Sequence, residues 1–414
     1  MAPIMHHHIM NAAEGTSWVC EQARAMGFDL CGVATIANAP AMRSSVSKTS
    51  LDGTFEELAY LPEWLAHGYA GEMNYLHDPR RADPRLVLDG AQSLIVVALN
   101  YNSPLPYSTE LPVAHADDSP RGWISRYAWG DDYHEVLGKK LDALVAAMRA
   151  RFAEPFEARA YVDTGPIVER IAAKYAGLGW LAKNTCLINE KMGSWLFLGV
   201  IVTTLDLAPA IQPGEPPAPD LCGNCRLCLD ACPTQAFPAP YFLDATRCIS
   251  YLTIELRGAI SDELRPAMGR AVIGCDICQD VCPWNRKSPA TQLAAFQPRQ
   301  FVPIAEDSSG GDEKKCSESL FAPELEKLAS LSQKEFSEVF RDSAVKRAKW
   351  RGMVRNACIA LGNSGVARDS DAHRRVVDLL ERLAGGDDPL IAEHARWALA
   401  RLNNPQDGAA SSSD

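Results

Sequence analysis

The stretches CGNCRLCLDACP (residues 222–233) and CDICQDVCP (residues 275–283) decide how this chain of 414 residues is organised. Each is a run of closely spaced cysteines that ends in Cys-Pro, and Cys248 lies between the two runs. Short spacers let several thiolates converge on one iron–sulfur cube, and soft thiolate ligands suit iron held with sulfide. The eight cysteines therefore predict two 4Fe–4S clusters with four ligands each.

The spacing also predicts which cysteines share a cluster. In two-cluster ferredoxins the last cysteine of a run ligates the other cluster. One predicted ligand set is Cys222, Cys225, Cys228 and Cys282, and the other is Cys232, Cys248, Cys275 and Cys278. Zinc sites would favour separated cysteine pairs, and a disulfide framework would require an oxidising compartment and usually a small chain. The pattern fits neither alternative and indicates electron transfer.

Composition indicates a globular protein of two or three domains. Apolar residues make up 47% of the chain, which is ample for hydrophobic cores. The longest apolar runs are too short to span a bilayer, so no membrane association is expected. No export signal is apparent, and many reduced thiols favour the cytoplasm. The net charge of −11 argues against a wholly basic nucleic-acid binder, but a local basic patch stays possible.

Hydrophobic patterning predicts an α/β layer domain over residues 17–215, with disordered ends at 1–16 and 404–414. Apolar runs with strand character alternate there with segments of helical periodicity. The strand candidates are 30–35, 94–99, 158–162 and 195–203. The helix candidates are 18–26, 62–75, 133–152 and 167–178. Such alternation is typical of layered helix-and-sheet domains, so the whole chain is expected to be an α+β multidomain protein.

A Pro-rich linker at 209–219 is followed by a ferredoxin-like module with the two clusters, predicted over residues 216–300. Residues 301–403 then have the character of successive helices. Two Ala- and Leu-rich segments in this part, 355–363 and 394–402, share a register about forty residues apart, which is the period of two-helix solenoid repeats. The sequence therefore predicts HEAT-like helical repeats, with a plain helical bundle as the alternative.

Several ordered motifs closely resemble those of the epoxyqueuosine reductases. They are RYA-x-G-x-DYH at 126–134, VDTGP at 162–166, GLGWLAKNT at 177–185, CISYLTIE at 248–255 and GCDICQDVCPWN at 274–285. Ala182 departs from the family, which usually has glycine there. The resemblance covers most of residues 17–403 and implies that the first domain binds cobalamin beside the two clusters.

The same resemblance implies an activity: reduction of epoxyqueuosine to queuosine in a tRNA anticodon, the last step of queuosine biosynthesis. It implies a cob(II)alamin resting state and an external low-potential electron donor. It also implies that Asp163 is the acid that protonates the leaving oxygen. A buried carboxyl beside an apolar cofactor is expected to have a raised pKa. The alternative is that Asp163 caps the helix that follows.

Cofactor and tRNA contacts are expected in the family-like and basic segments. The cobalamin candidates are Arg81, Arg126, Asp163, Lys183, Asn184, Thr185, Ser250, Cys275 and Asp276, for which structural ion pairs or caps are the alternative. Six basic residues against one acidic residue in segment 341–355 predict a phosphate-binding patch, with a solvated helix face as the alternative. The tRNA candidates are Arg257, Lys346, Arg347, Lys349 and Arg351.

Two other functions compete with this one. A reductive dehalogenase also combines cobalamin with two clusters, but it would normally carry an export signal. A ferredoxin-like electron carrier would not need the long domain ahead of the clusters. The remaining cysteines, outside the two runs, are expected to be small buried apolar residues: Cys20, Cys31, Cys186, Cys316 and Cys358.

Overall fold

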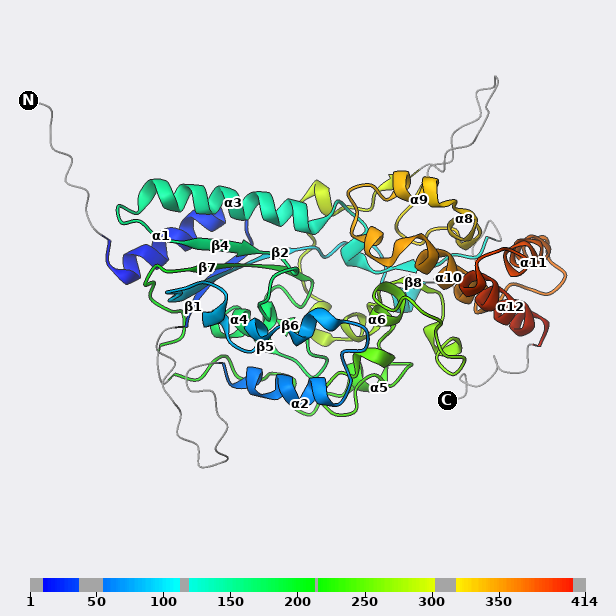
Figure 1. The fold of residues 1–414 in the computed structure, drawn as a ribbon, viewed down its shortest axis with the longest axis horizontal. Helices are drawn as coiled ribbons and strands as arrows, with labels where there is room; N and C mark the ends of the chain where they lie inside the picture. The colour runs from blue at the N-terminus through cyan, green and yellow to red at the C-terminus, as the bar shows by residue number, and fades with distance from the viewer. Residues whose placement is uncertain (1–9, 37–54, 112–118, 213–214, 302–317, 405–414) are drawn as a thin grey trace, which may run out of the picture.

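The computed structural model describes residues 10–36, 55–111, 119–212, 215–301 and 318–404. The molecule is elongated, with a layered N-terminal domain at one end and a group of helices at the other (Figure 1). Cys316 and nearly all of the predicted C-terminal tail lie outside the described residues. Within the described ranges, no helix is long and apolar enough to cross a membrane.

An antiparallel sheet of four strands forms the centre of the N-terminal domain. In order across the sheet, the strands are β1 (Leu30–Thr35), β2 (Ser93–Asn100), β7 (Leu196–Thr203) and β4 (Ala158–Tyr161). Each forms within one or two residues of its predicted ends. Alternating strands and helices are more typical of a parallel sheet, so the domain is layered as predicted but is not of the parallel α/β type.

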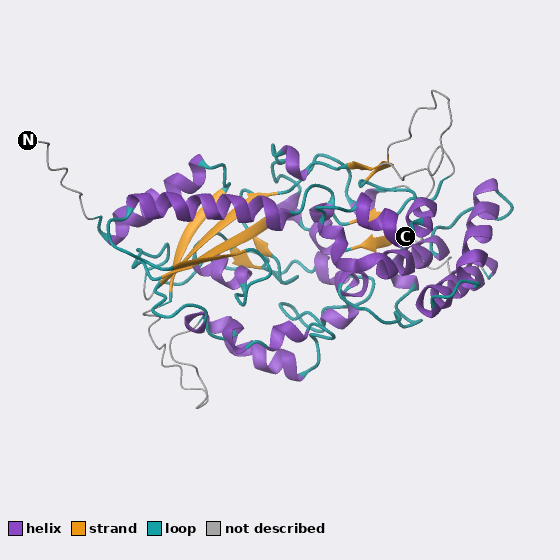
Figure 2. Ribbon diagram, turned by 45° about the horizontal axis from the view of Figure 1, so that its top comes forward, coloured by secondary structure: helices purple, strands orange, loops and turns teal. Residues whose placement is uncertain are grey.

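Three helices cover the two faces of this sheet (Figure 2): α1 (Ala12–Ala25), α3 (Tyr133–Arg151) and α4 (Glu169–Tyr175). Every residue of β2 is buried, because strands flank it and helices lie on both sides. Successive side chains of a strand point to opposite faces. Accordingly, Ile95 and Val97 pack in the core under α1 and α3, whereas Leu94 and Val96 pack in the core under α4.

The first helix begins earlier than predicted. The Asn11 side chain accepts a hydrogen bond from the Glu14 N–H (2.9 Å), and the Glu14 carboxylate accepts one from the Asn11 N–H (3.0 Å). Such a capping box stabilises a first helical turn by about 1 kcal/mol. The prediction of disorder over residues 1–16 is therefore wrong from residue 12 onward, and residues 1–9 lie outside the described ranges.

The helix predicted over residues 62–75 is largely wrong. Only α2 (Leu61–Ala66) forms, and turns follow it, including the short 3-10 helix η2 (Asn74–His77). Gly68 and Gly71 have φ values of 73° and 55°. Glycine adopts this left-handed conformation readily, and it ends a helix.

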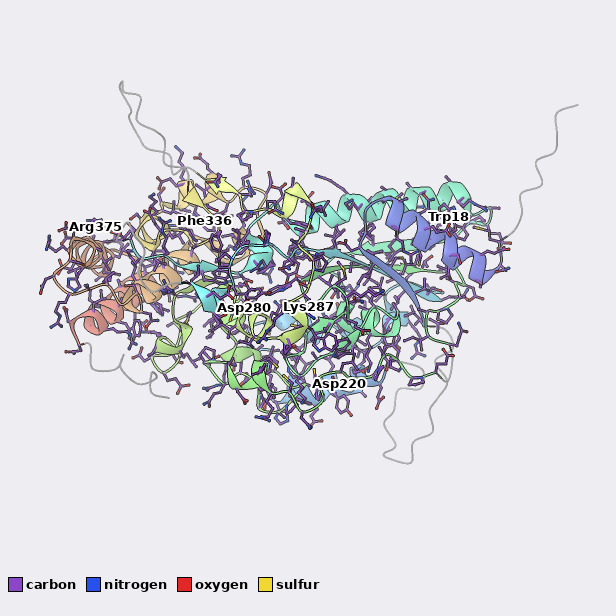
Figure 3. All side chains as sticks on the ribbon, turned by 180° about the vertical axis from the view of Figure 1, so that it is seen from behind. Trp18, Asp220, Asp280, Lys287, Phe336 and Arg375 are labelled. Carbon is purple, nitrogen blue, oxygen red and sulfur yellow. The ribbon has the colours of Figure 1, made fainter. Side chains whose placement is uncertain are left out.

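The two cysteine runs lie in a module of short elements. Its helices are α5 (Leu227–Asp230), α6 (Ile249–Ile254) and α7 (Ile277–Asp280), and its strand β8 (Ala271–Ile273) pairs in parallel with β3 (Trp123–Ile124). Asp220, just before the first run, and Asp280, within the second, lie between Trp18 at one end of the molecule and Arg375 at the other (Figure 3). Because β3 comes from the N-terminal half, the cluster module and the first domain are joined by more than the linker.

The C-terminal part is helical, as predicted. Its helices are α8 (Leu325–Ser330), α9 (Gln333–Val339), α10 (Lys349–Gly362), α11 (Asp371–Ala384) and α12 (Pro389–Asn403). The two similar segments fall on α10 and α12, which pack closely: a Cβ at Gly362 would lie 2.9 Å from the Ala398 Cα. HEAT-like repeats stay a prediction.

Candidate cluster sites and active site

Four cysteines drawn from both runs line one cavity. The cavity has a volume of about 260 Å³ and also contacts Trp284. Its thiols come from Cys222, Cys225 and Cys228 of the first run and from Cys282 of the second. Burial, together with the charges of Cys222 and Cys225, raises the pKa of Cys228 to about 11. Thiols of this kind must lose their protons when they bind metal, so metal binding here releases protons.

The other four cysteines form a second group. Cys232 follows α5, Cys248 precedes α6, and Cys275 and Cys278 lie at the start of α7. Burial and the charge of Cys248 raise the pKa of Cys275 well above its ordinary value, and the charge of Cys232 adds to the effect. The Ala236 N–H donates a hydrogen bond to the Cys232 sulfur (3.4 Å). Such bonds stabilise the negative charge that a cluster ligand carries.

The two groups follow the crosswise order, because the last cysteine of each run lies with the other run. Among the described residues, no three or more His, Cys, Asp or Glu side chains are placed to bind a single metal ion. The ligands of a cubane cluster stand farther apart, since a cage of iron and sulfide lies between them.

A β-hairpin, β5 (Trp180–Leu181) and β6 (Leu187–Ile188), has its turn beside both groups of thiols. The Lys183 ammonium donates to the Cys225 carbonyl (2.9 Å), and the Asn184 amide donates to the Cys278 carbonyl (3.2 Å). Lys183 and Asn184 thus hold the cysteine loops in place. These hydrogen bonds engage their polar ends, and their roles as cobalamin contacts stay a prediction.

Asp163 follows β4 in a strained turn. Its φ of 56° lies in the left-handed region, which costs a non-glycine residue about 1–3 kcal/mol. The turn also requires glycine at position 165, because a Cβ there would lie 2.4 Å from the Tyr161 ring. The next helix is α4, and its N-cap position is held by Val168, so Asp163 does not cap it. The strained turn instead presents a carboxylate that is 67% exposed.

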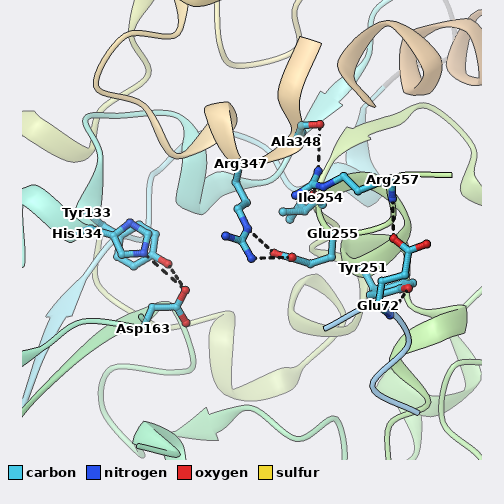
Figure 4. A network of polar contacts seen from close by, with 10 residues as sticks. All are labelled: Glu72, Tyr133, His134, Asp163, Tyr251, Ile254, Glu255, Arg257, Arg347 and Ala348. Carbon is cyan, nitrogen blue, oxygen red and sulfur yellow. Dashed lines mark hydrogen bonds and ion pairs between the residues drawn. The ribbon is translucent and has the colours of Figure 1, made fainter. Parts of the chain in front are cut away.

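A histidine and a tyrosine from the start of α3 bind this carboxylate (Figure 4). Tyr133 donates its hydroxyl to Asp163 (3.1 Å), and the His134 Nε2 lies 3.5 Å from the same oxygen. On its other side, the His134 Nδ1 lies 2.6 Å from the Asp132 carboxylate. The imidazole is therefore held between two carboxylates.

These contacts decide where the proton resides. Burial lowers the pKa of His134, but its hydrogen bonds to Asp132 and Asp163 outweigh burial and raise the pKa to about 9. Burial would raise the pKa of Asp163, because protein lies on most sides of it even though solvent reaches it. The hydrogen bond and charge of His134 outweigh this effect and lower the pKa. The expected raised pKa of Asp163 is therefore wrong, since the proton is held by His134.

Other charged and aromatic groups surround Asp163. Arg81 is buried, donates to the Ile167 carbonyl (3.3 Å) and lies 5.5 Å from the centre of the Tyr75 ring, which is 47% exposed. Among the described residues, the buried Oε1 of Glu169 has no hydrogen-bond partner. Burial and the charge of Asp163 raise the pKa of Glu169 to about 7. An exposed ring and an unpaired buried oxygen beside a reachable carboxylate form a surface that a ligand would complete.

A second polar network in the same region joins three parts of the chain (Figure 4). Arg347, from the turn before α10, binds Glu255 at the end of α6 through two hydrogen bonds of 2.8 Å. The Arg257 guanidinium donates to the Ala348 carbonyl (3.3 Å), and its backbone N–H donates to the Glu72 carboxylate (3.0 Å). The helical part, the cluster module and the first domain therefore meet beside the active site.

Two further cobalamin candidates have structural roles. Arg126 and Asp276 are each 1% exposed. Asp276 accepts hydrogen bonds from the Arg126 N–H (2.8 Å) and the Trp123 indole (3.1 Å), and the Arg126 guanidinium donates to the Leu105 carbonyl (3.2 Å). These side chains face the interior of the protein, and their roles as cofactor contacts stay a prediction. The remaining cobalamin candidates also stay predictions: Arg81, Asp163, Thr185, Ser250 and Cys275.

The basic segment 341–355 does not form one continuous surface patch. Arg355 is 0% exposed and lies inside α10, where it donates to backbone carbonyls. Arg351 pairs with the carboxylate that caps α12 (2.5 and 2.9 Å). Lys346 and Lys349 are exposed, and neither forms an ion pair with another described residue. With the exposed Arg341, which also forms no ion pair with another described residue, these two lysines carry the unpaired positive charge of the segment.

Sequence reasoning assigned no role to His134, although it lies in a quoted motif. The available signal was the Asp-Tyr-His order at the start of a predicted helix. Asp132 caps that helix by accepting the His134 N–H (3.0 Å), and this fixes the imidazole beside it. What the sequence does not show is that the turn after β4 brings Asp163 to the other side of the ring.

Comparisons with known proteins agree with this arrangement. Residues 81–164 match the family model described as "Epoxyqueuosine reductase QueG, DUF1730", and residues 221–285 match the model of a 4Fe-4S double cluster binding domain. The epoxyqueuosine reductase of Gloeobacter violaceus is 42% identical over 83% of this chain and 95% of its own length. That of Pseudomonas aeruginosa is 39% identical over 84% and 87%.

Solved structures give the same result. A crystal structure of an epoxyqueuosine reductase with an epoxyqueuosine-modified tRNA-Tyr stem loop has a TM-score of 0.74 and 29% identity, over 94% of this chain and 90% of that one. The Bacillus subtilis enzyme, solved with its catalytic aspartate loop swung out of the active site, has a TM-score of 0.73 and 28% identity, over 94% and 91%. With curated relatives of this identity and coverage, the chain belongs to the epoxyqueuosine reductase family, a family of oxidoreductases.

Proposed function

We propose that this epoxyqueuosine reductase uses two 4Fe–4S clusters and cobalamin to convert epoxyqueuosine to queuosine in a tRNA anticodon, as the last step of queuosine biosynthesis. The observation that carries the proposal is the placement of two groups of four thiols in the same molecule as a reachable Asp163 paired with a charged His134. An electron path and a proton source are both needed to remove an oxygen atom as water.

The clusters are assigned crosswise. Cys222, Cys225, Cys228 and Cys282 hold the first, since they line one cavity. Cys232, Cys248, Cys275 and Cys278 hold the second. Electrons enter from an external low-potential donor. A cytoplasmic location stays a prediction.

The surface around Asp163 fits a large ligand that has an apolar face and polar edges, as cobalamin has. The exposed ring of Tyr75 offers an apolar contact, and the unpaired Oε1 of Glu169 offers a hydrogen-bonding position. Thr185 and Ser250, near the cysteine loops, supply hydroxyl groups. When bound, cobalamin supplies low-valent cobalt, a strong nucleophile toward carbon.

The protein's own contribution is to orient the substrate and to supply protons. Opening an epoxide to an alkene consumes two electrons and two protons and releases water. His134 holds one proton at Nε2, 3.5 Å from the Asp163 carboxylate, and Tyr133 holds that carboxylate from a second direction. Asp163 receives one proton from His134 and delivers it to the leaving oxygen, and the second proton comes from solvent, which reaches the exposed Asp163 carboxylate. The strained turn at Asp163 keeps the carboxylate at the accessible end of the sheet.

The tRNA is proposed to bind where the helical part meets the active site. A relative's structure holds an epoxyqueuosine-modified tRNA stem loop. Here Lys346 and Lys349 are exposed and Arg347 lies beside the active site, which places positive charge where a phosphate backbone would run. A base that reacts inside a protein must leave the stack of its loop. Arg257 and Arg351 are exposed nearby and complete the proposed set.

The test is anaerobic reconstitution of the full chain with iron, sulfide and cobalamin, followed by nucleoside analysis of tRNA that carries epoxyqueuosine. We expect conversion to queuosine with the unsubstituted protein and a loss of at least a hundredfold with Asp163→Asn, the usual contribution of a positioned acid. Glu157→Gln is the control. Turnover of chlorinated organic compounds instead of tRNA would support a dehalogenase, and a protein that binds no corrinoid would be only an electron carrier.

A further inference from the structure

The β5–β6 hairpin places a tryptophan beside the first group of thiols. Trp180, in β5, is 3% exposed and belongs to a small hydrophobic core that includes Ile188 and Cys282. Cys222 and Trp284 pack against this core. Trp180 therefore lies beside two of the four cysteines assigned to the first cluster, one from each run.

The indole N–H of Trp180 lacks an acceptor. Its Nε1 atom is buried and has no hydrogen-bond partner among the described residues. Trp195 is the other described tryptophan with a buried, unpaired Nε1, but it packs in the core under α1 and α3, which contains none of the eight cluster cysteines. A buried N–H without an acceptor costs free energy, and nearly all such groups in native proteins are paired. The Trp180 N–H is therefore a donor available to a group held by the thiols.

Packing and hydrogen bonds hold the indole in this place. The Trp284 ring meets it edge to face, with ring centroids 5.0 Å apart and planes at 75°. Gly179 lets the two strands of the hairpin approach closely, since a Cβ there would lie 2.0 Å from the Ile188 carbonyl oxygen. The hairpin is also tied to the first cysteine run, because the Lys183 ammonium donates to the Cys225 carbonyl (2.9 Å). The same hairpin thus holds the donor and positions the thiols.

The indole acts on one sulfur of this group. Burial raises the pKa of the Cys222 thiol, and the Lys183 backbone N–H and the nearby Trp180 indole oppose this effect. The indole N–H thus lies near a sulfur without forming a hydrogen bond to the uncharged thiol. Metal binding removes the thiol proton, and a charged acceptor forms shorter and stronger hydrogen bonds.

We propose that the Trp180 indole donates an N–H···S hydrogen bond to the Cys222 thiolate and raises the reduction potential of the first cluster. The inference rests on the proposed pair of clusters. Reduction adds one electron from the external donor, and part of the added negative charge resides on the ligand sulfurs. A donor to such a sulfur stabilises the reduced state more than the oxidised state. Trp180 is thus a positioning residue that makes the first cluster easier to reduce.

The experiment is a redox titration of the full chain, reconstituted anaerobically with iron and sulfide and monitored by electron paramagnetic resonance. Trp180→Phe keeps an aromatic ring against Trp284 and removes the N–H. We expect it to disfavour reduction of one cluster by about tenfold, a fall of about 59 mV for one electron, and to leave the other cluster unchanged. Trp18→Phe is the matched control and should change neither potential, because Trp18 lies at one end of the molecule, away from the cysteine runs (Figure 3).

Two further measurements make the test specific. The cluster whose potential falls should be the one that Cys228→Ala removes, and a fall confined to the other cluster would overturn the inference. Electron nuclear double resonance of the reduced protein should detect an exchangeable proton that Trp180→Phe loses. If that variant binds less iron, β-(3-benzothienyl)alanine at position 180 decides the question, since it keeps both rings and replaces the N–H with sulfur.

Unchanged potentials in a position-180 variant that binds its full iron would overturn the inference, and so would an equal fall in Trp18→Phe. Failure of the proposed function is distinguishable from both, because the unsubstituted protein would then bind no iron and give no cluster signal.

Discussion

At the scale of single residues, the proton on His134 is the feature that most changes the chemistry expected of this active site. A carboxyl with a raised pKa could act as the acid by itself. Here Asp163 is ionised, and the imidazolium beside it stores the proton. The positive charge of His134 neutralises the negative charge of Asp163. The pair can therefore hold a proton for delivery without the free-energy cost of burying an isolated charge.

We expect His134 to titrate with a pKa of about 9 in the folded protein, above its ordinary value of 6.5. Stability from this ion pair is then fully present below about pH 6.5 and is lost as pH rises through about 9. Asp163→Asn should move the His134 pKa back toward 6.5 and flatten the dependence of stability on pH over this range. Nuclear magnetic resonance of the imidazole and thermal unfolding measure the two effects. An unshifted His134 in the unsubstituted protein would contradict the pairing.

Crosswise ligation can be tested by pairs of cysteine substitutions. If Cys228 and Cys282 serve one cluster, replacing both with alanine should cost no more iron than replacing either, and about four of the eight irons should remain. Replacing Cys278 together with Cys282 should remove both clusters. Iron analysis and electron paramagnetic resonance measure the outcome. If each run served its own cluster, the second pair would instead spare one cluster.

At the scale of elements, α10 shows how a helix from one part can hold another. Its Arg355 and Asn356 are both 0% exposed. Arg355 donates to the carbonyls of Leu252 in α6 (2.6 Å) and of Gly258 beyond it (2.7 Å). Asn356 donates to the Val272 carbonyl in β8 (2.8 Å). Polar groups inside a helix interface cost free energy unless they are paired. Their pairing fixes α10 against the cluster module.

Arg355→Met should therefore destabilise the protein strongly. The substitution leaves buried carbonyls without donors, and each such group costs about 1–3 kcal/mol. Arg351→Met is the matched control, because Arg351 is 51% exposed and an exposed ion pair is worth about 1 kcal/mol or less. Chemical denaturation measures both. Equal losses for the two variants would show that the buried arginine does not hold α10 in place.

The sequence predicted elements better where their signals are local. The buried strand β2 and the amphipathic helix α3 carry an apolar periodicity that needs no knowledge of the rest of the chain. The helix predicted for the segment after α2 was wrong, because Gly68 and Gly71 interrupt a pattern that otherwise has helical periodicity. Roles that depend on distant contacts, such as the burial of Arg126 by the loop at residues 103–106, have no local signal.

The same limit applies to the candidate site. Cysteine spacing predicted a crosswise pairing because the loops are short and the ligand chemistry is specific. The exposed positive charge of segment 341–355 was overestimated. A count of charges along the chain does not reveal that Arg351 forms an ion pair and that Arg355 is buried.

At the scale of the whole molecule, the three parts of the chain meet at one place. The ion pair of Arg347 and Glu255 and the contacts of Arg257 join the helical part, the cluster module and the first domain beside Asp163 (Figure 4). A substrate bound there would touch residues from all three. The helical part therefore both braces the cluster module and supplies the charged side chains that a polyanion would meet.

This arrangement predicts a local and salt-dependent tRNA contact. Charge reversal of both exposed lysines, Lys346→Glu with Lys349→Glu, should weaken tRNA binding and reduce the steepness of its salt dependence by about 1.4 to 1.8, the value for two lost phosphate contacts. Lys139→Glu with Arg149→Glu, on α3 of the N-terminal domain, changes the net charge equally and is the control. Binding measured over a range of salt concentrations separates the two. If both double variants weakened binding alike, only the total charge would matter, and the lysines before α10 would not be the site where the tRNA backbone binds.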